Sequence, residues 1–422
     1  MLSDRSRRKE GGSLRSWLPL ALLAVLVAAI GWFALRGPGE AAPTAATAGA
    51  SQAPQGPQFF GQVGGQPDPA PAAAERARRR QQLVENVQLT DHTYCSYREG
   101  SKYPMSSRPM AQNPDQAYPN RPVTEMTPMR TGDRSSNPNI LLQTSQSRVF
   151  MAAGESVAFS IRAVTPDGTV LPLVVTRAVA AGIMTTGSRP TTQVALAFAD
   201  DGAGADPVPG DGAFAAVLTP AQTGLAGFHG TIRTEVRYTA GGQKGIQVFD
   251  VIYSPSVPAV WAGQPREIVE DGSLAFVLRV DVRKPGRYVI TGRVDDAQGR
   301  PFALATFNEV LGPGPNEVKL TVFGKLMHDG APALPLTLRD VDGYLLRENV
   351  DPDRELMPRL EGPVLKSRTA SLNGISDAEW TSEERERYLT EFAKDRKLAR
   401  GELEKFDPTQ PLPPSACETP GR

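Results

Sequence analysis

The feature that most constrains this chain of 422 residues is one unbroken apolar run near its start, residues 17–35. A helix over this run would be about 28 Å long, close to the bilayer hydrocarbon core of about 30 Å. Basic residues precede the run, and Ala-, Pro- and Gly-rich sequence with almost no charge follows it. The positive-inside rule therefore predicts a single-pass anchor with residues 1–16 in the cytoplasm and the remaining mass outside it.

A cleaved signal peptide is the alternative reading of the same run. Signal peptides usually carry an apolar region of about 7–15 residues, and this run is longer. It also ends in Trp32, Phe33 and Leu35, and aromatic residues suit a membrane interface. The Ala-rich sequence after Pro43 still offers cleavage sites, so retention of the anchor is an expectation that needs a test.

The charge and the cysteine content narrow the class of partner and the compartment. Lys+Arg and Asp+Glu both number 46, so the net charge is zero and no long-range field favours nucleic acid. We therefore expect no nucleic-acid partner.

In an oxidising compartment, the two cysteines Cys95 and Cys417 could form one disulfide between the start and the end of the folded region. Two free or separately paired thiols are the alternative.

Short strands dominate the centre of the chain. Val157, Phe159 and Ile161 alternate with small or polar residues, and Leu274 to Val280 alternate in the same way. A period of two is typical of half-buried strands, and Gly-bearing turns every ten residues or so are typical of a sandwich. No helical pattern separates the strands, which disfavours a parallel α/β fold. The sequence predicts a mainly β protein with two sandwiches.

The flanking segments complete the predicted organisation. A charged stretch near the C-terminus carries an apolar stripe that includes Trp380, Tyr388 and Phe392. Such a stripe either docks on its own domain or binds a partner. The predicted order is a basic cytoplasmic segment (1–16), a transmembrane helix (17–35), a Pro/Ala-rich linker with a short helix (36–90), an irregular strap (91–139), two sandwiches (140–254 and 255–372), and a C-terminal helix with a tail (373–422).

Several phrases resemble those of a known class of module. The second strand set contains K-P-G-R-Y at 284–288, G-P-G-P-N-E-V at 312–318 and P-L-T-L-R-D-V at 335–341, and the first contains an acidic turn from Asp200 to Phe214. Together they resemble bacterial immunoglobulin-like modules of the choice-of-anchor-X type. The resemblance covers about residues 140–371. It implies immunoglobulin-like sandwiches in a cell-envelope protein, where such modules serve adhesion, scaffolding and spacing. Together with the predicted anchor, it leads us to expect a single-pass protein of the bacterial inner membrane whose sandwiches contact a protein partner outside the cytoplasm. The resemblance implies no single activity, because fold does not fix function.

One acidic cluster deserves a metal hypothesis. Asp200, Asp201, Asp206 and Asp211 lie within twelve residues, beside Gly202, Gly210 and Gly212. Carboxylate oxygens on a tightly turning loop could hold Ca²⁺, although the spacing does not match an EF-hand. The alternative is an Asp/Gly turn in which each carboxylate accepts hydrogen bonds from nearby backbone N–H groups. Calcium is the one cofactor that the sequence raises.

Enzyme motifs are missing from the sequence. It holds no G-x-S-x-G elbow, no H-E-x-x-H, no Walker A loop and no C-x-x-C. We expect a non-enzymatic protein with a protein partner. Two alternatives remain open. A carbohydrate- or peptidoglycan-binding module would expose aromatic rings such as Trp261 or Tyr344 on a sandwich face. An enzyme without a known motif would gather carboxylates around His229 or His328.

Overall fold

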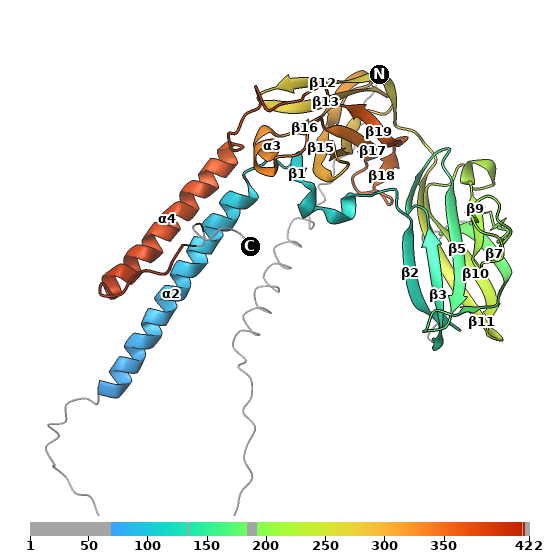
Figure 1. The fold of residues 1–422 in the computed structure, drawn as a ribbon, viewed down its shortest axis with the longest axis horizontal. Coiled ribbons are helices and arrows are strands. Elements are labelled where there is room, and N and C mark those ends of the chain that lie inside the picture. Colours follow the sequence, from blue (N-terminus) through green and yellow to red (C-terminus); the bar gives the residue numbers. More distant parts are fainter. Residues whose placement is uncertain (1–68, 133–134, 184–191, 416, 418–422) are drawn as a thin grey trace, which may run out of the picture. The chain divides into compact units, whose positions relative to one another are not determined.

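The computed structural model describes residues 69–422 except 133–134, 184–191, 416 and 418–422, and residues 69–422 group as one compact unit (Figure 1). Strands make up most of the regular secondary structure of the described part, and long helices lie near its two chain ends. The predicted anchor and most of the predicted linker fall outside the described residues. Among the helices that are described, none is both long and apolar enough to cross a membrane.

The first sandwich packs two sheets of five strands each around one apolar core. One sheet has the order β2-β3-β5-β6 with β9 paired to β5, and the other has the order β4-β11-β10-β7-β8. The strands are β2 (Val123–Arg130), β3 (Ser136–Gln146), β4 (Phe150–Ala152), β5 (Val157–Val164), β6 (Val170–Leu171), β7 (Leu173–Gly182), β8 (Val194–Ala195), β9 (Phe214–Leu218), β10 (Gly230–Ala240) and β11 (Gln243–Ser254). A short 3-10 helix, Pro220–Gln222, follows β9.

The β10–β11 hairpin shows how local sequence builds this sandwich. Buried residues alternate along β10, with Ile232, Val236 and Tyr238 pointing into the core. Gly241 and Gly242 form the two-residue connection, and both adopt positive φ angles, 56° and 75°. A two-residue loop with positive φ at both positions matches the twist of the flanking strands, and glycine adopts it without steric cost.

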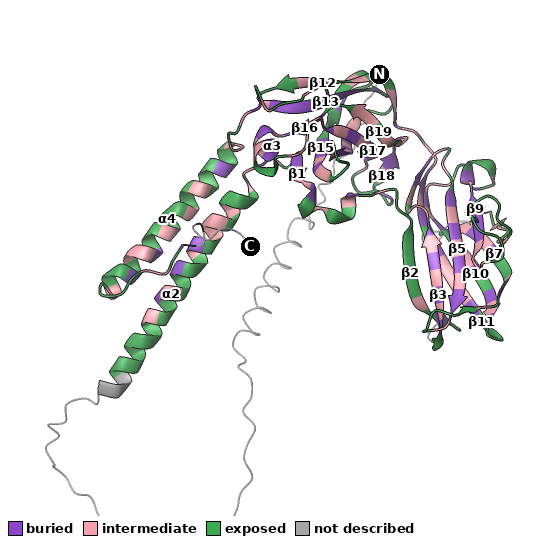
Figure 2. Ribbon diagram, viewed as in Figure 1, coloured by how far each residue is buried: buried purple, intermediate pink, exposed green. Residues whose placement is uncertain are grey.

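The second sandwich places a six-stranded sheet against a three-stranded one. The large sheet has the order β1-β15-β14-β17-β18 with β19 paired to β17, and the small sheet has the order β12-β13-β16. The strands are β1 (Ser107–Pro109), β12 (Ala259–Glu270), β13 (Ser273–Val282), β14 (Gly286–Asp295), β15 (Pro301–Leu311), β16 (Gly314–Val322), β17 (Thr337–Leu346), β18 (Arg354–Leu356) and β19 (Leu360–Lys366). Helix α3 (Gly324–Gly330) follows β16. Figure 2 shows buried residues gathered on the inner strands of both sandwiches.

Two helices from opposite ends of the described part pack against each other in antiparallel orientation, and we call this pair the helical hairpin. Helix α2 (Pro69–Gly100) packs along α4 (Glu383–Phe406) through Leu83 and Val87 on one side and Ala399 and Leu403 on the other. The ring of Tyr97 also meets the rings of Phe392 and Tyr388, at centroid distances of 5.3 and 5.7 Å. The apolar stripe of the C-terminal helix thus docks on the chain's own α2.

The structure corrects the predicted short helix and irregular strap. Helix α2 continues to Gly100, ten residues into the segment 91–139 that we expected to be irregular, because its Tyr97 packs on α4. The remainder of that segment contains β1, the 3-10 helices Met110–Gln112 and Pro114–Gln116, β2 and the start of β3. Pro128 fits within β2 because that strand lies at a sheet edge, where a missing N–H breaks no ladder.

The strap therefore contributes one edge strand to each sandwich. Strand β1 pairs with β15 at the edge of the second sandwich, and β2 pairs with β3 at the edge of the first. The C-terminal helix also begins later than its sequence suggests. Ser382 is its N-cap and accepts a hydrogen bond from the N–H of Arg385, whereas the capping-box sequence at 376–379 stays outside the helix.

Candidate functional site

The acidic loop between β8 and β9 brings three of its four aspartates together. Carboxylate oxygens of Asp200, Asp206 and Asp211 lie within 4.8 Å of one another, and Asp206 is buried. Asp201 is not part of this group, and its carboxylate accepts a hydrogen bond from the N–H of Ala203 at 3.0 Å. The sequence hypothesis of four clustered carboxylates thus holds for three of them.

The three carboxylates already accept hydrogen bonds inside the loop. Asp200 accepts from the N–H groups of Gly210 and Gly212 at 2.7 and 2.9 Å. Asp206 accepts from Gly202 and Val208. Asp211 accepts from the N–H of Ala213 and from the guanidinium of Arg162. Gly202 cannot be replaced easily, because φ is +73° and a Cβ would lie 2.7 Å from Pro209 Cδ.

This geometry makes a self-supporting turn, and calcium binding there stays a prediction. Each carboxylate accepts hydrogen bonds from backbone N–H groups of the turn, which have no partner in a β-sheet. The same oxygens could face an ion, since Ca²⁺ takes six to eight oxygen ligands. The carboxylates therefore stabilise the turn between β8 and β9. A calcium-binding experiment tests whether they also hold an ion.

The two cysteines meet at the helical hairpin. Cys95 of α2 and Cys417 of the C-terminal tail form a disulfide across a sequence separation of 322, with their Cα atoms 5.2 Å apart. Buried Asp91 lies one turn before Cys95 and accepts hydrogen bonds from the Arg396 guanidinium at 2.6 Å and from the Ser415 hydroxyl. The disulfide and this polar cluster fix the tail to the hairpin.

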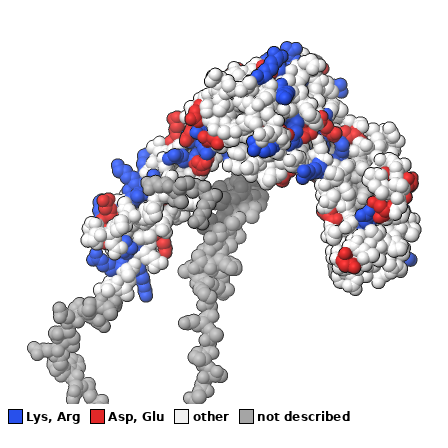
Figure 3. Space-filling view, in the orientation of Figure 1, with Lys and Arg blue, Asp and Glu red and all other residues white. Residues whose placement is uncertain are grey.

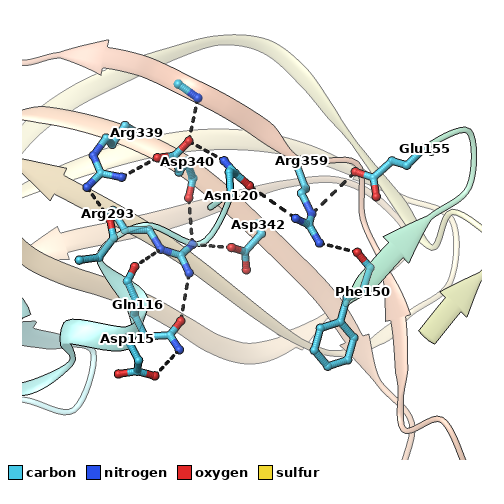
Figure 4. A network of polar contacts seen from close by, with 12 residues as sticks. Asp115, Gln116, Asn120, Phe150, Glu155, Arg293, Arg339, Asp340, Asp342 and Arg359 are labelled. Carbon is cyan, nitrogen blue, oxygen red and sulfur yellow. Dashed lines mark hydrogen bonds and ion pairs between the residues drawn. The ribbon is translucent and has the colours of Figure 1, made fainter. Parts of the chain in front are cut away.

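A second polar site lies where the two sandwiches meet, and sequence analysis did not find it. Figure 4 shows the arginines and aspartates that gather there. We call the set Arg293, Arg339, Asp340, Asp342 and Arg359 the junction clamp. All five come from β14, β17 or the segment between β18 and β19, and they bind residues of the strap and of the first sandwich.

Arg293 of β14 is the most buried member of the clamp, with 2% of its surface exposed. Its guanidinium donates to the backbone oxygen of Gln116 at 3.0 Å and to the side-chain oxygen of the same residue at 3.1 Å. It also donates to the backbone oxygen of Asp340 and to the carboxylate of Asp342. A planar fork of five N–H donors suits such a convergent set of oxygens, which a lysine could not satisfy.

Arg339 and Asp340 extend the clamp along β17. Arg339 donates to Asp295 and Asp340 at 2.5 Å and to the backbone oxygen of Ala117 in the strap at 2.7 Å. Asp340 has a φ of +46°, which is unusual for a residue other than glycine. Its carboxylate accepts from Asn120 and from the N–H of Gly362, so three groups hold this carboxylate in place.

Arg359 joins the two sandwiches directly (Figure 4). Its guanidinium donates to the backbone oxygen of Phe150 in β4 at 2.7 Å, and it forms an ion pair with Glu155 at 3.7 Å. Arg148 of the first sandwich also pairs with Glu155, at 3.0 Å. The contacts are mostly charge-assisted and are shielded from solvent on the Arg293 side, which favours a fixed junction over a loose one.

Glu355 of β18 adds a buried ion cluster beside the clamp. Lys284 and Arg347 lie 2.7 and 2.9 Å from its carboxylate, and the Ser256 hydroxyl donates to it at 3.0 Å. Burial raises the pKa of Glu355, but the hydrogen bonds from Lys284 and Ser256 and the charges of Lys284 and Arg347 outweigh burial. Its pKa therefore lies below the ordinary 4.5.

The residues of the two alternative hypotheses lie apart from any common centre. Trp261 is half-buried and donates its indole N–H to the backbone oxygen of Pro358 at 2.7 Å. The ring of Tyr344 lies under the guanidinium of Arg354 at 4.6 Å. His328 bonds the backbone oxygen of Ile375 at 3.1 Å, and among the described residues no metal-type cluster contains a histidine. Trp261 is also one of the residues that line a cavity of about 380 Å³ on the second sandwich.

Comparison with known proteins assigns this chain neither a family nor an activity. Neither a protein-family model nor a curated protein sequence matches the chain. Similar solved structures include a DUF4785 family protein from Legionella pneumophila, at 16% identity and a TM-score of 0.36, covering 55% of this chain and 58% of that chain. The adhesin InvE of Yersinia pseudotuberculosis matches at 10% identity and a TM-score of 0.16, covering 51% and 58%.

Fibronectin(III)-like modules of CbhA from Clostridium thermocellum match at 14% identity and a TM-score of 0.18, covering 50% of this chain and 84% of that chain. The matched region spans less than two thirds of the Legionella and Yersinia chains. All three TM-scores are below 0.5. None of these matches assigns a ligand, a partner or an activity to this chain.

Proposed function

We propose that this chain is a single-pass protein of the bacterial inner membrane that presents two immunoglobulin-like sandwiches outside the cytoplasm for contact with a protein partner. It acts as a scaffold or an adhesin, without enzymatic chemistry of its own. The resemblance of its strand phrases to choice-of-anchor-X modules supports the immunoglobulin-like assignment. The apolar run at 17–35 supports the anchor.

The observation that carries this proposal is the Cys95–Cys417 disulfide. Disulfides persist in the periplasm and at the cell surface and are rare in the cytoplasm, where thiols are kept reduced. The junction clamp supports a presenting role, because a display protein benefits from sandwiches held in one arrangement. Figure 3 shows basic and acidic residues interspersed over the visible face of the described part, which suits contact with proteins better than with nucleic acid.

The direct test of the compartment is thiol trapping in growing cells. Cells are quenched in acid, and the denatured protein is alkylated with a mass tag before or after reduction. We expect no tag before reduction and two tags after it. A Cys417→Ser variant should take one tag without reduction, which calibrates the assay. Two tags on the unreduced wild-type protein would contradict an oxidising location.

Cross-linking in intact cells tests the presenting role. A short cross-linker followed by purification of the full chain should yield a discrete cross-linked species that contains one other protein. A variant in which the exposed residues of β2 carry charge, Val123→Glu with Met126→Glu, tests whether this edge of the first sandwich contributes. If the full chain forms no cross-link to another protein under any growth condition tested, the proposed protein partner is contradicted.

A further inference from the structure

A cavity of about 330 Å³ opens beside the junction clamp, lined by the strap and by both sandwiches. We call it the junction cavity. Five arginines and two aspartates line its wall, a formal lining charge of +3. Glu155, Glu361 and Asp353, which are not among the lining residues, pair with three of these arginines. That volume lies at the lower end of the range of about 300–1,000 Å³ that is typical of small-molecule sites. Its charge is unusual for a chain whose overall net charge is zero.

Two of the five arginines are committed to the fold. Arg293 and Arg359 belong to the clamp, where backbone oxygens, Asp342 and Glu155 occupy their donors. Asp342 is likewise occupied by Arg293. These groups shape the wall of the junction cavity, and the remaining three arginines, Arg121, Arg148 and Arg354, determine what it could bind.

Arg121 and Arg354 both stack on aromatic rings, and Arg354 also forms an ion pair with Asp353 at 3.4 Å. The guanidinium of Arg121 lies 3.9 Å from the ring centroid of Tyr118, and no carboxylate among the described residues pairs with it. Arg354 lies 5.1 Å from the ring of Phe150 and 4.6 Å from that of Tyr344, so it contacts one ring from each sandwich. Stacking occupies the face of a guanidinium and leaves its in-plane N–H donors for an anion.

Arg148 adds a donor that the protein does not satisfy. Its Nε atom is buried and has no hydrogen-bond partner, although its terminal nitrogens pair with Glu155 and Glu361. A buried N–H without an acceptor is costly, and a bound oxyanion would remove that cost. Three guanidiniums thus line one cavity. Arg121 forms no ion pair in the described part of the chain, Arg148 keeps one unpaired N–H, and Arg354 uses one side of its fork for Asp353.

We propose that the junction cavity binds a small multivalent organic anion of the di- or tricarboxylate class. Arginine forks match the geometry of carboxylates, and several carboxylates on one molecule match the net charge of the wall. Arg148 comes from the first sandwich, Arg354 from the second and Arg121 from the strap. A bound anion therefore ties the three segments together. This site does not depend on the anchor or on a protein partner.

The test is calorimetric titration of the full chain in detergent with citrate as the probe. Citrate should bind with a dissociation constant in the micromolar to millimolar range, and added salt should weaken the binding because the attraction is electrostatic. Acetate, with one carboxylate, and glycerol, with none, should bind far more weakly. Citrate should also raise the melting temperature, since it binds only the folded junction.

Matched variants locate the binding. Arg121→Gln with Arg354→Gln should lower the citrate affinity by about tenfold or more, because two charge-assisted donors are lost. Arg287→Gln, an exposed arginine of β14 outside the cavity, should leave it unchanged. If the double variant does not fold, Arg121→Gln alone decides, because that side chain is exposed.

Three results would overturn the proposal. The first is no heat of citrate binding to the wild-type chain. The second is an unchanged citrate affinity in the folded arginine variants. The third is inorganic phosphate or acetate binding as tightly as citrate, which would indicate a simple oxyanion site without selectivity for several carboxylates. None of these outcomes bears on the thiol trapping or cross-linking experiments, so the two proposals fail separately.

Discussion

At the scale of single residues, buried charge decides how this molecule holds together. Arg293 satisfies four oxygens from the strap and from β17 while it is almost fully buried. Removing one partner of a buried ion pair leaves the other charge and its backbone neighbours unpaired. Arg293→Met should therefore lower the free energy of unfolding by about 3–5 kcal/mol, measured by chemical denaturation.

Arg287→Met on the same strand is the matched control. Its side chain is exposed and reaches only Asn308, so a change within about 0.5 kcal/mol is expected. Arg293→Lys keeps the charge but loses the fork, and it should lie between the two. Equal stability of the Arg293→Met and wild-type proteins would show that the clamp does not stabilise the folded state.

The acidic loop offers a second residue-scale comparison. Asp206 is buried and accepts hydrogen bonds from Gly202 and Val208, whereas Asp201 is exposed and accepts one from Ala203. Asp206→Ala should cost about 1–3 kcal/mol because it leaves backbone donors unsatisfied, and Asp201→Ala should be nearly neutral. Thermal melts of both variants measure the two losses of stability, and a larger loss for Asp201→Ala than for Asp206→Ala would contradict this expectation.

Calcium binding is tested on the same proteins. If the loop holds the ion, millimolar Ca²⁺ should raise the melting temperature of the wild-type chain, and a chelator should reverse the rise. The double variant Asp206→Ala with Asp211→Ala should not respond. Identical melting curves with Ca²⁺ and with chelator would leave the loop as a strand-connecting turn.

Glu355 gives a pH dependence whose direction is fixed by its lowered pKa. Its contribution is complete above the unfolded pKa, near 4.5, and is lost as the pH falls through the lower folded value. Glu355→Gln should be less stable than the wild type at neutral pH, and the difference should shrink below about pH 4.5. Denaturation midpoints across this range measure it. A difference that grows toward acid pH would contradict the assignment.

At the scale of elements, sequence patterns predicted the strands better than the segments that join them. Alternation identified β5 and β13. One face of β5 is buried, whereas residues 273–278 of β13 are buried on both faces. Helix α2 extends past its expected end because Tyr97 packs on α4, a contact almost 300 residues away along the chain. The strap strands β1 and β2 likewise owe their structure to distant partners. Local propensity carries no signal for such contacts.

The candidate sites divide in the same way. The short spacing of the four aspartates between Asp200 and Asp211 predicted their proximity, and the structure brings three of the four carboxylates together. The junction clamp gave no such signal, because its members are scattered from position 293 to position 359 and meet strap residues near 116. The phrase L-R-D at 338–340 was visible as a module phrase, but its role in binding the strap depends on the fold.

The hairpin disulfide gives a prediction at this scale. Closing a loop of 322 residues stabilises the folded state by about 6 kcal/mol in the chain-entropy model. Cys417→Ser, or reduction of the wild type, should lower the melting temperature of the full chain. Cys417→Ser and Cys95→Ser should match each other, since each removes the same bond. A melting temperature that is insensitive to reduction would show that α2 and α4 hold the tail without it.

At the scale of the whole molecule, a predicted anchor precedes two packed helices and two sandwiches joined at a polar junction. Alkaline phosphatase folds only outside the cytoplasm and β-galactosidase works only inside it, so a fusion of each enzyme after Ser51 reports on which side of the membrane the sandwiches lie. We expect active phosphatase and inactive β-galactosidase. Active β-galactosidase with inactive phosphatase would place the sandwiches in the cytoplasm and rule out the predicted topology.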